Sequence, residues 1–106
     1  MGANDADMLR VAREVADMGG GMAVSSSDAI TARLPLPIAG LMSGETARKV
    51  DEQLAGVVRA AQQLGCTLEN PFATLSFMAL TPIPELKLTD QGLFDSVNFC
   101  FVPLFV

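Results

Sequence analysis

Apolar residues recur at helical spacing near the start of the chain. The apolar positions are Met8, Val11, Ala12, Val15 and Met18, which form one stripe on a helix. Asn4 is suited to cap the helix, and Asp5 and Asp7 favour the positive end of its dipole. The glycine run at 19–21 ends it, because glycine reaches left-handed conformations without steric cost. A phosphate-binding loop is disfavoured, because such loops precede a helix.

Two short apolar runs then flank a Ser/Asp turn, which predicts a β-hairpin from Met22 to Ser25 and from Ala29 to Leu34. Pro35 and Pro37 cannot donate to a strand ladder, so the chain is expected to leave the sheet there as an extended apolar loop. This loop is either a connection across the core or a contact surface, including a wall of a site in another domain.

The next periodic segment predicts a helix that starts at Ser43 or Gly44 and ends at Gly65. Its apolar positions are Val50, Leu54, Val57, Ala61 and Leu64. Gly56 lies in mid-helix, where glycine costs about 1 kcal/mol relative to alanine. We expect close packing against a neighbouring element at that position.

The final third of the chain predicts mainly strands. After the Asn70-Pro71 turn signal, the run at 72–80 is apolar and hydroxyl-rich, and we expect a strand there. Pro82 and Pro84 force an extended break before a short strand at 87–89.

Residues 90–92 predict a turn, and the phenylalanine-rich segment at 97–106 predicts a buried or paired terminal strand. The whole pattern predicts an α+β fold, with mostly antiparallel β-sheet flanked by at least two α-helices. A single domain over residues 1–106 is expected from the length.

Composition suggests that this chain is part of a larger assembly. Hydrophobic residues make up 50% of the chain and charged residues only 18%. A small domain has too little interior to hide such a surplus, so part of its apolar surface should be covered by something outside this chain. The net charge of −5 argues against nucleic acid as a partner. No apolar run is long enough to span a membrane, and a cytoplasmic location is expected.

Candidate chemistry is sparse. The chain has no histidine and no tyrosine, so it lacks the commonest general base and zinc ligand. Glu85, Asp90 and Asp95 are better suited to strand ends and turn capping than to acid–base work, and Glu85 and Lys87, on one face of a strand, can form an ion pair of small net value. No base is apparent for a nucleophilic serine.

Sulfur-containing residues are expected to pack rather than to bind metal. Cys66 and Cys100 lie far apart without metal-ligand spacing, and we expect reduced, partly buried thiols. The six methionines form no spaced cluster, which favours core packing over copper binding.

Several motifs together resemble the C-terminal domain of bacterial adenine deaminase, a member of the amidohydrolase superfamily. In chain order they are GANDADM, MGGGMAV, LPLPIAGLMS, NPFATLSFMAL and IPELKLTDQGLFD, followed by the phenylalanine-rich end. The resemblance spans residues 2–102, and the two proline-containing motifs are long and unusual in composition.

The resemblance implies a three-part parent protein with a (β/α)8 barrel, a small β-sandwich and this α+β domain. The implied reaction is hydrolysis of adenine to hypoxanthine and ammonia, with adenine as the parent's substrate. The parent is expected to use manganese or iron, often as a pair, to activate water. The histidine ligands and the proton-shuttling carboxylate would belong to the barrel, so no catalytic or metal-binding residue and no cofactor are expected in this chain.

The expected partners are the catalytic barrel of the same protein and a second subunit in a homo-oligomer. Candidate contacts lie in the two proline-bounded segments, 34–43 and 79–88, because stiff extended backbone lowers the entropy cost of ordering. The candidate contact residues are Gly40, Leu41, Met42, Ser43, Pro82, Pro84 and Glu85. Two alternatives are a stand-alone binding or homodimerisation module without catalysis, and a free-standing enzyme that uses carboxylates alone.

Overall fold

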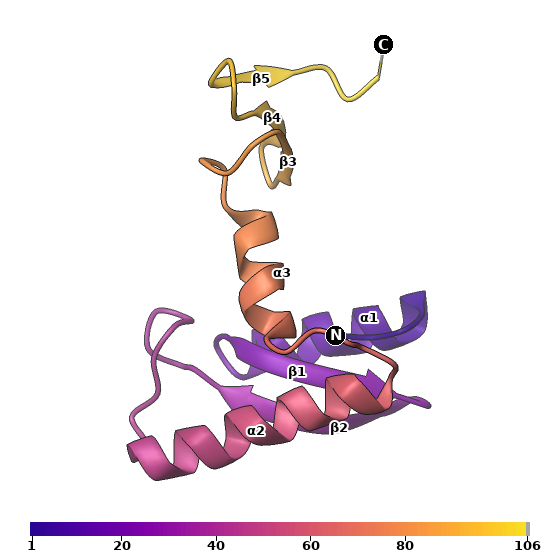
Figure 1. Ribbon diagram of the computed structural model, residues 1–106, viewed down its shortest axis with the longest axis vertical. Coiled ribbons are helices and arrows are strands. Elements are labelled where there is room, and N and C mark those ends of the chain that lie inside the picture. The colour runs from indigo at the N-terminus through magenta and orange to yellow at the C-terminus, as the bar shows by residue number, and fades with distance from the viewer. Residues whose placement is uncertain (106) are drawn as a thin grey trace. The chain divides into compact units, whose positions relative to one another are not determined.

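The computed structural model describes residues 1–105, which group into two compact units (Figure 1). Unit 1 is Met1–Glu69, and unit 2 begins at Asn70. Unit 1 contains α1 (Asp5–Asp17), β1 (Gly21–Ser26), β2 (Ala29–Pro35) and α2 (Ala47–Gln63). Unit 2 contains α3 (Pro71–Ala79), β3 (Leu86–Thr89), β4 (Gly92–Asp95) and β5 (Cys100–Val102). The α+β class with antiparallel sheets is confirmed, and one domain over residues 1–106 stays a prediction.

Helix α1 begins as the sequence predicts. The side chain of Asn4 accepts a hydrogen bond from the Asp7 backbone N–H at 2.8 Å, and the helix ends at Asp17, two residues before the glycine run. The predicted apolar stripe is only partly correct, because Met8 and Ala12 are exposed. The one fully buried side chain of α1 is instead the carboxylate of Asp7.

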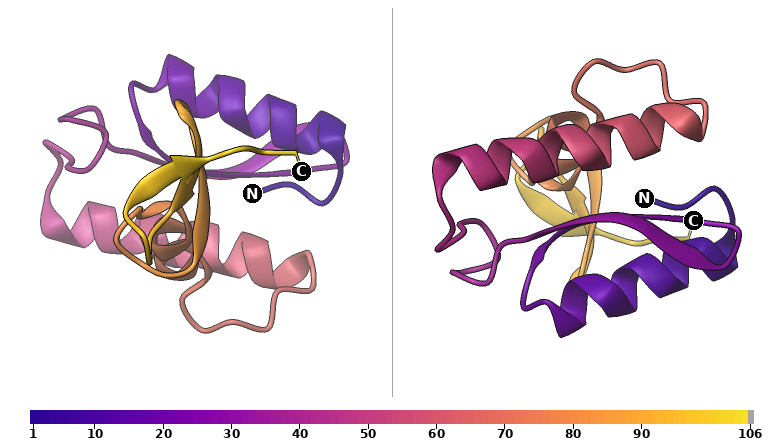
Figure 2. Two further views of the ribbon diagram at one scale, coloured as in Figure 1. Left: turned by 90° about the horizontal axis from the view of Figure 1, so that it is seen from above. Right: turned by 90° about the horizontal axis from the view of Figure 1, so that it is seen from below.

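The predicted hairpin is confirmed as β1 paired antiparallel with β2. Ser27 and Asp28 both have positive φ, which is the signature of the type I′ turn that suits a two-residue hairpin loop. The hairpin lies between α1 and α2 (Figure 2). Strand β2 alternates between exposed and less exposed positions, whereas in β1 Ala23, Val24 and Ser25 are buried in succession rather than in alternation. With Leu34, Val57, Ala60 and Ala61 they form the core of unit 1.

Helix α2 starts later than the sequence predicts. Thr46 is the N-cap and accepts from the Lys49 N–H, whereas the Ser43 hydroxyl accepts from the Glu45 N–H at 3.1 Å in a local turn. The expected close packing at Gly56 is also wrong. A Cβ placed there would meet nothing within 4 Å, so the glycine is not required by a neighbour.

The strand expected at 72–80 is wrong, because this segment forms α3. Pro71 occupies the first turn, where its missing N–H has no intrahelical partner to lose. The Thr74 hydroxyl donates to the Asn70 carbonyl, and that of Ser76 donates to the Ala73 carbonyl. These bonds let hydroxyl residues stay within a helix.

Unit 2 also holds an antiparallel sheet in the order β3-β4-β5. The predicted strand and turn before β4 are confirmed, with Gly92 at φ +134°. The terminal strand is shorter than predicted: only Cys100–Val102 pairs with β4, while Phe101 stays 54% exposed. Val106, the last residue of that predicted strand, lies outside the described residues. No helix within residues 1–105 combines the length and apolar character needed to cross a membrane.

Candidate functional site

The first candidate contact segment, Gly40 to Ser43, belongs to a tight turn after β2. Ile38 and Met42 form an antiparallel bridge, and the Ile38 N–H donates to the Met42 carbonyl at 3.0 Å. Between them, Ala39 and Gly40 take positive φ values of 55° and 73°. The side chains of Leu41 and Met42 are 78% and 57% exposed. The turn thus presents two apolar side chains from a hydrogen-bonded backbone.

The glycine run supports this turn, a role that the sequence analysis missed. The Leu36 N–H donates to the Gly20 carbonyl at 3.0 Å. A Cβ on Gly20 would lie 2.4 Å from the Gly40 Cα, and one on Gly21 would lie 2.2 Å from the Leu34 carbonyl oxygen. Only glycine permits this approach of two backbones. The available signal was the run itself, since three consecutive glycines exceed what a helix end needs.

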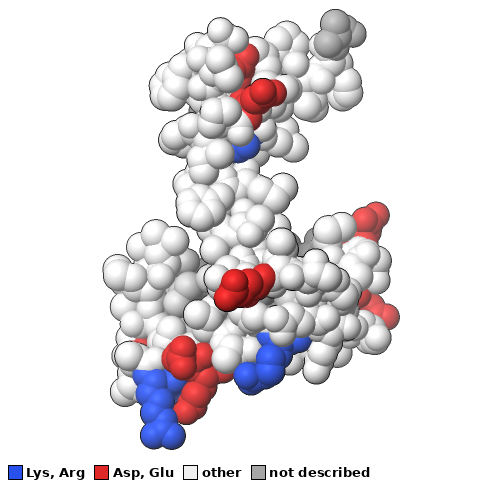
Figure 3. Space-filling model, in the orientation of Figure 1, with Lys and Arg blue, Asp and Glu red and all other residues white. Residues whose placement is uncertain are grey.

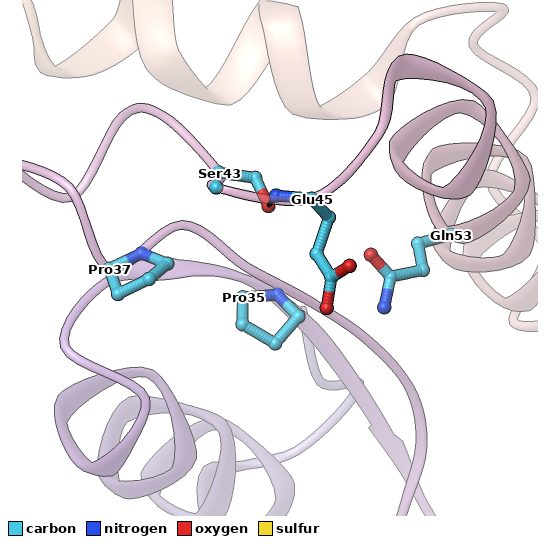
Figure 4. A pocket seen from close by; sticks show the side chains of 6 residues that line it. Pro35, Pro37, Ser43, Glu45 and Gln53 are labelled. Atoms are coloured by element: carbon cyan, nitrogen blue, oxygen red, sulfur yellow. Dashed lines mark hydrogen bonds between the residues drawn. The ribbon is translucent and has the colours of Figure 1, made fainter.

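A cleft of about 420 Å³ opens beside the turn (Figure 4). Its lining residues are Pro35, Pro37, Ser43, Gly44, Glu45 and Gln53. Glu45 accepts a hydrogen bond from the Lys49 ammonium at 2.7 Å. The buried Oε1 of Gln53 has no hydrogen-bond partner within residues 1–105, and the Gln53 and Glu45 side chains point toward one another (Figure 4). Chemically, the cleft combines apolar proline walls with oxygen acceptors and could receive an N–H donor.

The second candidate segment, with Pro82, Pro84 and Glu85, lies in unit 2 and is held by Ser96. The Ser96 hydroxyl donates to the carbonyls of Thr81 and Ile83, and the Ser96 N–H donates to the Glu85 carbonyl at 2.9 Å. The ion pair that Glu85 and Lys87 could form is not found within residues 1–105. Lys87 instead donates to the Pro84 carbonyl at 3.3 Å.

Asp95 confirms the expectation that acids here cap turns. Its Oδ1 accepts from the N–H groups of Val97 and Asn98 at 2.8 and 2.9 Å, and its Oδ2 accepts from the Asn98 side chain at 2.8 Å. The hydrogen bonds from Asn98 are the main cause that lowers the pKa of the Asp95 carboxyl from its ordinary value. A carboxylate held in this way is a poor proton acceptor.

A buried polar pair was not foreseen in the sequence. The Ser25 hydroxyl donates to Asp7 Oδ1 at 2.7 Å, and the Asn4 side chain donates to Asp7 Oδ2 at 2.9 Å. Asp7 is 2% exposed and Ser25 is fully buried. The chain has no histidine to act as a base beside this serine, so the pair joins α1 to β1 rather than forming a nucleophile.

The residues present do not fit a metal centre. Within residues 1–105, no three Cys, Asp or Glu side chains come together as a ligand group. Of the two free cysteines, Cys66 is half-buried as expected, whereas Cys100 is exposed, contrary to expectation.

Comparisons with known proteins place the chain in a family. Residues 1–100 match the family model described as "Adenine deaminase C-terminal domain". An adenine deaminase of Kosmotoga olearia is 48% identical over 106 residues, which are 100% of this chain and 18% of that relative.

Adenine deaminases of Desulfatibacillum aliphaticivorans and Methanoculleus marisnigri are 49% and 50% identical over 105 residues each. Those residues are 99% of this chain and 18% and 20% of the two relatives. The chain thus spans about a fifth of the length of the curated relatives that it matches. It belongs to the adenine deaminase C-terminal domain family.

Proposed function

We propose that this chain is the accessory and assembly domain of an adenine deaminase whose reaction takes place in polypeptide outside the chain. The observation that carries the proposal is a family match over residues 1–100, joined to the absence of any metal-ligand group within residues 1–105. The reaction is hydrolysis of adenine, in which water adds to the purine carbon that bears the amino group and ammonia leaves.

The proposed parent enzyme takes its chemistry from manganese or iron, which lowers the pKa of a bound water. This chain has no histidine, and within residues 1–105 no three acidic or cysteine side chains come together that could hold such an ion, which supports placing the metal in polypeptide outside the chain. Its contribution is to support the catalytic part. A domain in this role acts by holding the neighbouring polypeptide in the geometry that the reaction requires. Small displacements of catalytic groups from that geometry lower the reaction rate.

The turn at Gly40 to Ser43 is the best candidate for contact with the catalytic part or a second subunit. Leu41 and Met42 are exposed, yet their backbone is fixed by the Ile38–Met42 bridge and by the glycines behind it. A turn that is ordered before binding loses little entropy on contact. The segment with Pro82, Pro84 and Glu85, fixed by Ser96, is the second candidate.

A chimera tests the accessory role. In it, this chain replaces the matching C-terminal segment of the Kosmotoga olearia relative, and ammonia release from adenine is measured with manganese present. We expect activity in the chimera and far less in the same relative truncated before that segment. The isolated chain should release no ammonia. A truncated relative as active as the chimera, or activity in the isolated chain, would overturn the proposal.

The turn itself is tested by Met42→Ala and Ser43→Ala in the chimera. We expect KM to rise or kcat to fall, because the contact between the turn and the catalytic part is weakened. Met8→Ala is the matched control, since Met8 is also about half exposed but lies on α1. Kinetics unchanged in all three variants would reject a role for the turn.

The alternative is a stand-alone binding or homodimerisation module without catalysis. The observation in its favour is the exposure of Leu41, Met42 and other large apolar side chains. Sedimentation of the isolated chain separates the two proposals: an accessory domain is expected to stay monomeric at micromolar concentration, whereas the module would form a dimer.

A further inference from the structure

Unit 2 leaves large apolar side chains uncovered throughout. Within residues 70–105, eleven of them are at least 45% exposed: Leu75, Phe77, Met78, Leu80, Leu86, Leu88, Val97, Phe99, Phe101, Leu104 and Phe105. The charged residues from position 70 onward are only Glu85, Lys87, Asp90 and Asp95. The face drawn in Figure 3 accordingly shows few charged side chains over α3 and the sheet. Monomeric proteins rarely expose apolar patches beyond a few hundred Å².

Helix α3 exposes apolar side chains on opposite sides. Leu75 and Phe77 are two positions apart, which turns their side chains about 200° from one another on an α-helix. Met78 lies on the same side as Leu75. We name Leu75, Phe77 and Met78 the α3 surface. A helix that is apolar all round is one that other protein surrounds.

Helix α3 also has little to stabilise it locally. It is nine residues long, shorter than the roughly 12 residues at which isolated helices become even marginally stable in water. Asn70 makes no side-chain capping bond, and neither terminal turn has a charge that favours the helix dipole. Only Pro71 and Phe72 are buried. The helix therefore depends on packing along the rest of its length.

We propose that the α3 surface inserts into an apolar groove of the adenine deaminase polypeptide that lies outside this chain. This inference rests on the proposed function and adds to it a surface other than the proline-bounded segments. Because apolar side chains point to opposite sides of α3, the receiving site has two apolar walls. Burial of a Leu, Met or Phe side chain is strongly favourable, which supplies the force for docking.

The protein that covers the α3 surface is inferred from the share of its relatives' length that this chain matches. More than four-fifths of the Kosmotoga olearia relative lies outside the matched segment, so a large body of protein is joined covalently to this domain there. A tethered surface acts at an effective concentration of about a millimolar, well above that of a second copy in solution. The attached polypeptide thus outcompetes a second copy for the α3 surface.

Matched pairs of substitutions test the docking in the chimera defined above. The double variant Leu75→Ser with Met78→Ser changes the α3 surface. The control is Met8→Ser with Leu9→Ser, which has the same residue types on α1 at similar exposure, 51% and 53% against 45% and 64%. We expect the α3 variant to lower the Tm of the chimera by at least about 4 °C and the control by less than half of that.

The same two variants are compared in the isolated chain. There we expect both to shift Tm by less than about 2 °C, because the replaced side chains already contact water. Equal Tm losses from the two variants in the chimera, or an α3 variant that destabilises the isolated chain as strongly as the chimera, would overturn the inference. So would a dimer of the isolated chain that the α3 variant dissociates, since the occupant would then be a second copy.

Activity distinguishes this inference from the proposed function. A chimera that releases ammonia normally but shows no difference between the two variants contradicts docking and leaves the accessory role intact. A chimera whose Tm depends on the α3 surface, yet which releases no ammonia, supports docking and contradicts the accessory role.

Discussion

The two units of this chain treat their apolar residues differently. In unit 1, a hairpin lies between α1 and α2, and Val24 and Val57 are fully buried. Within residues 70–105 of unit 2, eleven large apolar side chains are at least 45% exposed, and only Pro71 and Phe72 are buried. Unit 1 thus forms a core of its own, although Leu41 and Met42 remain exposed, whereas unit 2 leaves most of the large apolar side chains of its helix and sheet uncovered.

This difference shows where the surplus of hydrophobic residues is located. The composition predicts that apolar surface is left for something outside the chain, and the structure concentrates that surface in unit 2. Phe94 illustrates the point. Its ring packs edge-on against Phe99 and Phe101 at 5.2 and 5.3 Å, yet Phe99 remains 74% exposed. Local aromatic pairing does not replace a core.

The largest effect on stability is expected from Gly21→Ala, which disrupts the close packing of the glycine run against β2 in unit 1. The new Cβ would lie 2.2 Å from the Leu34 carbonyl oxygen at φ +133°. We expect the free energy of unfolding of unit 1 to fall by more than about 3 kcal/mol, measured by urea denaturation. Gly40→Ala is the control, because a Cβ there meets nothing within 4 Å. Equal losses would contradict the close approach of the strands to the glycine run.

A smaller loss is expected from Ser25→Ala, which leaves the Asp7 carboxylate short of a donor inside unit 1. The expected loss is about 1–3 kcal/mol in the same measurement, because a buried acceptor becomes unsatisfied. Ser76→Ala, at an exposed position of α3, should change stability by no more than about 0.5 kcal/mol. If the two substitutions lower the free energy of unfolding equally, the contrast between the units is smaller than the burial of Ser25 and the exposure of Ser76 indicate.

An effect of opposite sign is expected from Gly56→Ala. The position is helical and a Cβ meets nothing within 4 Å, so alanine restricts the unfolded chain without a clash. We expect stabilisation by about 0.5–1 kcal/mol. A loss of stability would mean that another element packs against Gly56 after all.

The smallest effect is a pH dependence confined to unit 2. Since the pKa of Asp95 is lowered in the folded state, its contribution to stability is present above its ordinary pKa of 3.8 and is lost as pH falls below it. The protection factor of the Asn98 amide, which is its intrinsic exchange rate at a given pH divided by the observed rate, should fall between about pH 5 and pH 2 as the Asp95 carboxylate is protonated. Asp95→Asn should remove this dependence, and an unchanged dependence in the variant would assign it to another group.

Unit 1 was predictable because its signals are local and mutually consistent. The cap at Asn4, the turn at Ser27 and Asp28 and the apolar period of α2 each point to one element. The role of the glycine run was not predictable, since the approach of Gly40 to Gly20 is a contact between distant parts of the sequence. The bond between Ser25 and Asp7 was hidden for the same reason.

Helix α3 was mistaken for a strand because its apolar residues have no single covered face. Helical periodicity reveals a helix only when one side is buried and the other is polar. The signal that remained was the Asn70-Pro71 pair, which was interpreted as a turn but also suits the cap and first turn of a helix. Proline content predicts the stiff segments that hold the candidate contact residues. It does not indicate the α3 surface, which depends on the exposure of side chains along a helix.

Amide hydrogen exchange at residues 75–80, compared between the isolated chain and the chimera with the Kosmotoga olearia relative, tests most directly whether unit 2 is covered by attached polypeptide. Burial of α3 on both sides should suppress its local opening. We predict exchange at least about tenfold slower in the chimera, with the amides of Ala23 and Val24 in unit 1 little changed. Equal rates at residues 75–80 in the two proteins would show that α3 stays uncovered and would contradict the account.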